Sequence, residues 1–115
     1  MTERVFAITD ACTASGISVF NLHQMIHRGR LVPTRETRKE VARGFTLRDI
    51  VHIAAIADLR AAGLSLARAV EVAGRSVEGT AGRETVVHRH GETEIVLNVP
   101  NIARRVRARL GLTPA

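Results

Sequence analysis

The fold of this chain is decided by residues 9–29, which read TDACTASGISVFNLHQMIHRG. Capping residues and glycines divide this stretch into a short helix over 10–15 and a second helix over 19–28. Gly16 ends the first helix, because glycine adopts a positive φ without steric cost, and Ser18 caps the second. Two short helices joined by a glycine-containing turn of about three residues are typical of a helix-turn-helix. The side chains predicted to pack in this motif are Ala11, Ala14, Ile17, Leu22 and Ile26.

The positive charge of the chain is concentrated beside this motif and near the C-terminus. The 115 residues, 45% of them apolar, are enough for one domain, and 17 basic against 11 acidic residues give a net charge of +6. Residues 28–48 hold seven basic and two acidic residues, and residues 101–110 hold four arginines and no acid. The rest of the chain therefore has a net charge of −3. Such local cationic surfaces are expected of a protein that binds nucleic acid.

Residues 34–44 predict a basic wing next to the second helix. Pro33 disfavours helix in the residue before it, so the segment that enters the wing is extended. Phe45 returns the chain to the apolar interior, and an apolar residue therefore lies at each end of the charged run. We interpret the segment as two short strands around a basic loop; a plain solvated loop is the alternative.

The longest predicted helix begins after Thr46. Asp49, three residues later, completes a sequence that resembles a capping box, and the helix runs to Gly63. Its apolar residues cover more than half of the helix surface, so we expect it to be buried from two sides, with a second subunit as the second cover. A fourth helix is predicted over 66–73 and ends at Gly74.

The C-terminal part, residues 86–115, is predicted to form a β-hairpin and a helix. Residues 75–85 precede it as a linker or mobile loop, because they contain two glycines and no apolar periodicity. His90 and Gly91 predict the hairpin turn, and Pro100 suits the first turn of the helix that follows.

The fold class expected is mainly α with small β: a winged helix-turn-helix over 1–74, then the hairpin and the helix. Because an isolated hairpin is only marginally stable in water, we expect the C-terminal part to form a homodimer. The residues predicted to pair with a second chain are Ile95, Leu97, Val99, Ile102, Val106 and Leu110. The alternatives are that the arginine-rich helix contacts DNA or binds an acidic partner protein.

The ordered motifs from Phe6 to about Ala73 resemble the winged helix-turn-helix of MerR-type regulators. The matching pieces are Gly16-Ile17-Ser18, Asn21-Leu22-His23-Gln24-Met25, Gly29-Arg30-Leu31-Val32-Pro33, Arg35, Arg43-Gly44-Phe45-Thr46 and Leu59-Arg60-Ala61-Ala62-Gly63-Leu64-Ser65-Leu66. The resemblance implies a bacterial DNA-binding regulator. The chain departs from the family pattern at His23-Gln24, where the family has Arg-Tyr, and it lacks the family's long coiled-coil helix and cysteine-bearing loop. A role in sensing an effector is therefore not implied.

The second helix and the wing supply the candidate contacts with double-stranded DNA. In a helix-turn-helix the N-terminal part of the second helix reads base edges in the major groove. The candidates in helix 18–28 are Ser18, Val19, Asn21, His23 and Gln24. The cations expected on phosphates or in the minor groove are Arg28, Arg35, Arg38, Lys39 and Arg43. We expect a dimeric transcriptional regulator. The alternatives are a phage or mobile-element protein (an excisionase-like architectural factor or a small terminase subunit) and an adaptor that binds only proteins.

The sequence predicts no enzyme, cofactor or metal site. It has no glycine-rich phosphate loop, paired-acid motif or Ser-His-Asp order. His23 and His27 lie one helical turn apart, but no third ligand is near them in sequence. Cys12 is the only cysteine, which excludes an intramolecular disulfide. Neither a signal peptide nor a membrane span is expected, so we expect a cytoplasmic protein associated with the bacterial nucleoid.

Overall fold

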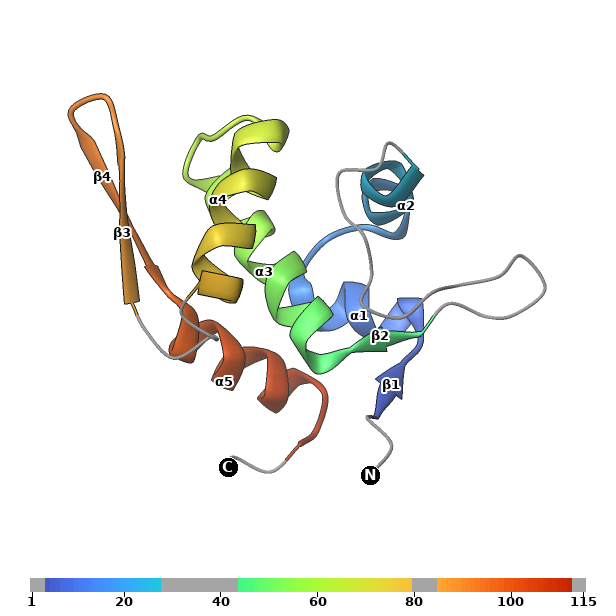
Figure 1. Cartoon of the computed structure of the whole chain (residues 1–115). Coiled ribbons are helices and arrows are strands. Elements are labelled where there is room, and N and C mark those ends of the chain that lie inside the picture. Colours follow the sequence, from blue (N-terminus) through green and yellow to red (C-terminus); the bar gives the residue numbers. More distant parts are fainter. Residues whose placement is uncertain (1–3, 28–43, 80–84, 113–115) are drawn as a thin grey trace.

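The described part of the chain consists of helices and two short antiparallel strand pairs (Figure 1). The computed structural model describes residues 4–27, 44–79 and 85–112. Over these ranges the elements are, in chain order, β1 (Val5–Phe6), α1 (Ile8–Ser15), α2 (Val19–His27), β2 (Phe45–Thr46), α3 (Leu47–Ala61), α4 (Leu66–Gly79), β3 (Thr85–His90), β4 (Thr93–Asn98) and α5 (Val99–Arg109). The predicted fold class, mainly α with small β and a C-terminal hairpin and helix, is confirmed.

Helix α3 is the central element, and the predicted capping box begins it. Thr46 Oγ1 accepts a hydrogen bond from the Asp49 amide at 3.2 Å, and Asp49 Oδ2 accepts one from the Thr46 amide at 3.1 Å. Helices α1, α4 and α5 all pack on α3. Its buried apolar residues are Ile50, Val51, Ile53, Ala54, Ala55, Ile56 and Leu59. The prediction that a second subunit covers α3 is therefore wrong, because the C-terminal helix of the same chain folds back and supplies the cover.

Helix α4 is longer than predicted. It passes through Gly74 and includes the first part of the expected 75–85 linker, while residues 80–84 lie outside the described ranges. The added turn buries Ser76 and Val77, and the Ser76 hydroxyl donates to a carbonyl one turn earlier at 2.8 Å. Glycine inside a helix costs about 1 kcal/mol relative to alanine, which burial of one valine offsets. The glycine therefore does not end the helix.

A short strand near the N-terminus, which we did not predict, pairs with β2 and joins the start of the helix-turn-helix to the start of α3. Phe6 pairs with Phe45 in the antiparallel β1–β2 ladder, and both rings are buried. Gly44 allows the two strands to approach, since a Cβ at this position would lie 3.1 Å from the Cβ of Val5. Apart from Gly44, the predicted wing over 34–44 lies outside the described residues.

The predicted C-terminal hairpin is present, with its turn one residue later than expected. His90 pairs with Thr93, so the turn consists of Gly91 and Glu92 rather than His90 and Gly91. Gly91 has a φ of 63°, which favours glycine. The inner face of the hairpin reaches the core through the buried Leu97. Figure 1 shows the hairpin and α2 on opposite sides of the molecule, with α3 and α4 between them.

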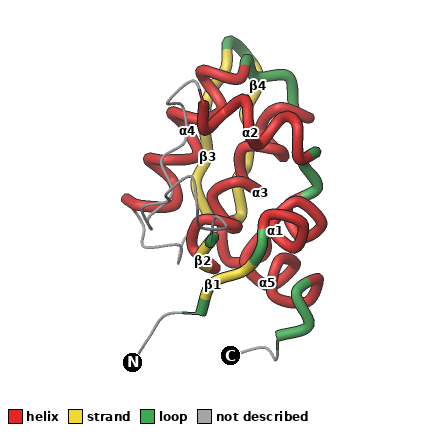
Figure 2. The backbone as a smooth tube through the Cα atoms, turned by 90° about the vertical axis from the view of Figure 1, so that its right-hand side faces the viewer, coloured by secondary structure: helices red, strands yellow, loops and turns green. Residues whose placement is uncertain are grey.

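Helix α5 begins with Pro100 in its first turn, as predicted, and Asn98 Oδ1 accepts a hydrogen bond from the Asn101 amide at 3.0 Å. It lies along α1 and α3 (Figure 2). Arg105 holds it there, because its Nη2 lies 3.1 and 3.0 Å from the two carboxylate oxygens of Asp58 on α3. Residues from helices α1 to α5, together with residues of strands β1, β2 and β4, form one hydrophobic core.

Candidate nucleic-acid interface

The turn between α1 and α2 is held from both sides. Gly16 has a φ of 80°, and its amide donates to the Cys12 carbonyl at 2.9 Å, which ends α1 in the left-handed conformation. From α5, Arg109 Nη1 donates to the Ala14 carbonyl at 3.1 Å. A cation at a helix C-terminus is stabilising because it offsets the partial negative charge of the last carbonyls. A residue far along the sequence therefore supports the turn that positions α2.

Helix α2 begins at the predicted cap and has one buried side. Ser18 Oγ accepts a hydrogen bond from the Asn21 amide at 3.1 Å, which confirms the cap. Leu22 and Met25 are buried and fasten the helix to the core. The contacts of α2 are mainly with α1, whereas α5 packs on α1 and α3. The opposite side of α2 is therefore not covered by the C-terminal elements.

The residues predicted to read bases lie where a ligand can reach them. Ser18, Val19, Asn21 and His23 are exposed, and Gln24 is half-buried. Helix α2 contains no Asp or Glu, so its surface does not repel a polyanion. The predicted phosphate-binding cations Arg28, Arg35, Arg38, Lys39 and Arg43 lie outside the described residues.

Phe20 is an exposed residue of this surface that we did not predict as part of the site. Its side chain is 69% exposed, more than any other large apolar side chain that the structure describes. The residues of α2 predicted to read bases were mainly ones that form hydrogen bonds, and Phe20 was not among them. Its position two residues before the buried Leu22 was the available signal, because residues two apart on a helix point to different sides.

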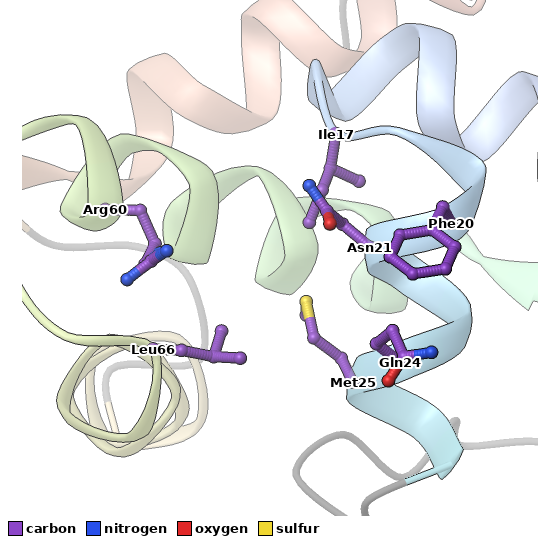
Figure 3. Close-up of a pocket in the computed structure, with 7 residues that line it drawn as sticks. All are labelled: Ile17, Phe20, Asn21, Gln24, Met25, Arg60 and Leu66. Atoms are coloured by element: carbon purple, nitrogen blue, oxygen red, sulfur yellow. The ribbon is translucent and has the colours of Figure 1, made fainter.

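An open hollow of about 500 Å³ lies beside the N-terminal turns of α2 (Figure 3). Its lining residues are Ile17, Phe20, Asn21, Gln24, Met25, Arg60 and Leu66. Figure 3 shows Arg60, from the end of α3, and Leu66, from the start of α4, across the hollow from the α2 side chains. Arg60 Nη1 contacts the Leu64 carbonyl at 3.5 Å. Arg60, which was not among the predicted site residues, therefore lines the same hollow as Asn21 and Gln24.

A comparison with models of protein families assigns residues 6–75 to the MerR HTH family of regulatory proteins. The match spans more than half of the chain and includes α1, α2, α3 and most of α4. The chain belongs to the MerR helix-turn-helix family. This is a family of DNA-binding regulators of transcription rather than of enzymes. A comparison with curated proteins finds no match.

The structure of the MerR-family chain also bears on metal binding, membrane spans and thiol chemistry. Among the described residues, no three His, Cys, Asp or Glu side chains gather in a way that could hold a metal ion. Within the same ranges, the helices are too short or too polar to cross a membrane. Cys12 is buried in the core, and burial raises the pKa of its thiol. The thiol therefore stays protonated at neutral pH, which disfavours nucleophilic chemistry.

The structure places most of the residues predicted for dimerisation inside the same chain. Leu97, Val99, Ile102 and Val106 are buried in its core, and Ile95 and Leu110 pack against that core half-buried. The four buried side chains therefore have no surface to offer a second subunit, and their predicted role is corrected. The reason is that α5 uses its apolar face to cover α3 and α1.

The exposed apolar residues of the C-terminal part lie instead on the outer face of the hairpin. Val87 and Val96 are cross-strand partners and are 55% and 62% exposed. Two pairs further along the ladder, and therefore on the same face, Arg89 and Glu94 form an ion pair at 3.4 Å. This outer face of the hairpin therefore combines an apolar pair with one charge of each sign.

The arginines of α5 are largely engaged within the chain. Arg105 contacts Asp58, and Arg109 contacts the Ala14 carbonyl. Arg104 is exposed and donates to Asn101 Oδ1 at 3.2 Å. The local positive charge found in the sequence thus serves partly to dock this helix on the helix-turn-helix.

Proposed function

We propose that this MerR-family protein is a sequence-specific regulator of transcription that places α2 in the major groove of double-stranded DNA. The observation that carries the proposal is the two-sided character of α2: Leu22 and Met25 anchor one side, while the other is exposed and free of acidic residues. This exposed side carries hydrogen-bonding side chains together with Val19 and Phe20. A helix of this kind fits the major groove, where every base pair presents a distinct pattern of donors and acceptors.

The side chains of α2 suit base edges of different kinds. Asn21 and Gln24 carry amides, which bind adenine through two hydrogen bonds. Ser18 and His23 both donate and accept hydrogen bonds, and Val19 offers an apolar contact. Arg60, across the hollow from Asn21, supplies a cation for a flanking phosphate. Contacts with phosphate set the position of the helix, and the base contacts provide specificity.

The wing over 34–44 supplies the cations for the phosphate backbone in this proposal. Neutralising about five phosphates gives a slope of roughly −4 to −5 for log K against log salt per protomer. The test is fluorescence anisotropy with a random duplex over a range of salt concentrations, for the natural chain and for Arg38→Glu. The matched charge control is Arg104→Glu, because Arg104 is exposed on α5, which packs on α1 and α3 rather than on α2, and lies outside the hairpin.

We expect Arg38→Glu to weaken binding and to lower the slope by about one to two, and Arg104→Glu to leave both nearly unchanged. Selection of bound sequences from a random DNA pool then yields the operator. Binding that is indifferent to salt, or equal losses in the two variants, would contradict the proposed placement of the wing on DNA. A selection that enriches no sequence would contradict specific readout.

We propose further that the protein acts as a homodimer that pairs through the outer face of the hairpin. A two-fold interface needs a self-complementary surface, and the Val87–Val96 pair with Arg89 and Glu94 offers one. Pairing there leaves α2 of both subunits uncovered, so that each reads one half-site.

Light scattering after size exclusion tests whether the protein pairs through the outer face of the hairpin. The double variant Val87→Thr with Val96→Thr should lower the molar mass, whereas Val19→Thr on α2 should not. A natural chain that is monomeric at the concentrations that bind DNA would refute it.

A further inference from the structure

We propose that Phe20 determines sequence specificity by contacting the 5-methyl group of a thymine in the major groove. The inference rests on the proposed function and names one contact within it. Thymine carries the one methyl group on the base-pair edges of the major groove of unmodified DNA, so it is the natural partner of an apolar side chain there.

The helical position of Phe20 directs its side chain away from the hydrophobic core. At about 100° per residue, Phe20 lies roughly 160° around α2 from Leu22 and roughly 140° from Met25. Since those two residues are buried, Phe20 is at the centre of the outward side. His23 and Gln24 follow it at i+3 and i+4 and share this side. Figure 3 shows the Phe20 ring beside the Gln24 amide. When α2 enters a groove, Phe20 thus enters with it.

The surroundings of Phe20 fit DNA better than another protein. Its ring is 69% exposed, and α2 has no acidic residue. The polar residues Asn21, Gln24 and Arg60 line the same hollow as the ring, together with the apolar Ile17, Met25 and Leu66. Its exposed apolar neighbour on the helix is Val19, at 40%. A stable interface between proteins has a larger desolvated apolar centre than one ring. An exposed ring beside hydrogen-bonding side chains matches the edge of an A·T pair, where the methyl lies next to acceptors and a donor.

The experiment removes the methyl group and the ring separately. In the duplex selected by the natural chain, each thymine is replaced in turn by uracil, which keeps every hydrogen-bonding group and loses only the methyl. Dissociation constants are measured for the natural chain, Phe20→Ala and Val19→Ala. At one or two positions per half-site we expect the natural chain to lose about fourfold in affinity, the value of one buried methyl group.

At those same positions Phe20→Ala should bind the thymine and uracil duplexes with nearly equal, lowered affinity, and Val19→Ala should keep the uracil penalty. Thermal unfolding of Phe20→Ala should match that of the natural chain, because the ring is mostly exposed. The inference would be overturned if the natural chain and Phe20→Ala lost the same affinity when thymine is replaced by uracil. It would also be overturned if only Val19→Ala abolished that loss, or if the natural chain showed no loss. In each of these cases DNA binding itself stands. A natural chain that binds no duplex overturns the proposed function and the inference together.

Discussion

At the scale of single residues, Cys12 combines burial with a position at the end of the helix that precedes the turn. Burial raises the pKa of its thiol, and its carbonyl oxygen accepts a hydrogen bond from the Gly16 amide. Because the thiolate is the reactive form, we expect iodoacetamide at pH 8 to label the folded chain at least about tenfold more slowly than the chain in urea. Mass spectrometry over time measures both rates. Equal rates in the two states would show that the thiol is accessible in the folded chain.

The same shift predicts how stability depends on pH. The folded thiol has the higher pKa, so the unfolded thiol, with a pKa of about 8.5, ionises first as the pH rises. The free energy of unfolding should therefore be unaffected by Cys12 below that pH and decrease above it. Urea unfolding at pH 7.5 and pH 10, compared with Cys12→Ala, isolates the contribution of this residue. A Cys12→Ala chain that loses as much stability as the natural chain would assign the alkaline loss to other groups.

At the scale of elements, the start of α3 depends on one side chain that serves two purposes. Thr46 pairs in β2 and also caps α3 through its hydroxyl. Loss of an N-cap costs about 1 kcal/mol, with a range of roughly 0.5–2 kcal/mol. We therefore expect Thr46→Ala to lower the free energy of unfolding in urea by about that amount, and Thr46→Ser, which keeps the hydroxyl, to lose much less. Both variants lack the Cγ2 methyl group of threonine. An equal loss of unfolding free energy in the two would therefore mean that this methyl group matters more than the cap.

The type of each element was easier to predict than its ends. Ser18, Thr46 and Pro100 marked helix starts correctly, because their role depends on hydrogen bonds or a dihedral within a few residues. Gly74 did not mark a helix end, since whether a helix continues depends on what its next turn can bury. The strand β1 was missed because two residues carry no periodicity, and its partner Phe45 is distant in sequence.

At the scale of the whole molecule, α5 is joined to the helix-turn-helix by arginines. The Arg105–Asp58 pair joins α5 to α3, and both side chains are more than a third exposed. A pair of this kind contributes about 0.2–1 kcal/mol and weakens with salt. We expect a double-mutant cycle of Arg105→Ala and Asp58→Ala, followed by urea unfolding, to give a coupling in that range, smaller at high salt. Arg104→Ala is the control, because the hydrogen bond that Arg104 donates goes to Asn101 on its own helix and does not join α5 to another element. A coupling of zero at low salt would mean that the apolar face alone docks α5.

The sequence by itself determined the helix-turn-helix, the Gly16 end of its first helix, the Ser18 cap of its second, the capping box of α3, the hairpin and the family, because these depend on residues close along the chain. It placed the start of the first helix at residue 10, whereas α1 begins at Ile8 and Ala7 is its N-cap. It also placed Ser18, Val19, Asn21, His23 and Gln24 on one helix as candidate base contacts. Only the tertiary structure decided which sides of the helices face the core. It assigned Val106 and Ile102 to the chain's own interior rather than to a partner, and it left Phe20 outward. An apolar residue in a sequence can be buried by any surface that reaches it, and only the folded arrangement of α1, α3 and α5 determines which surface does.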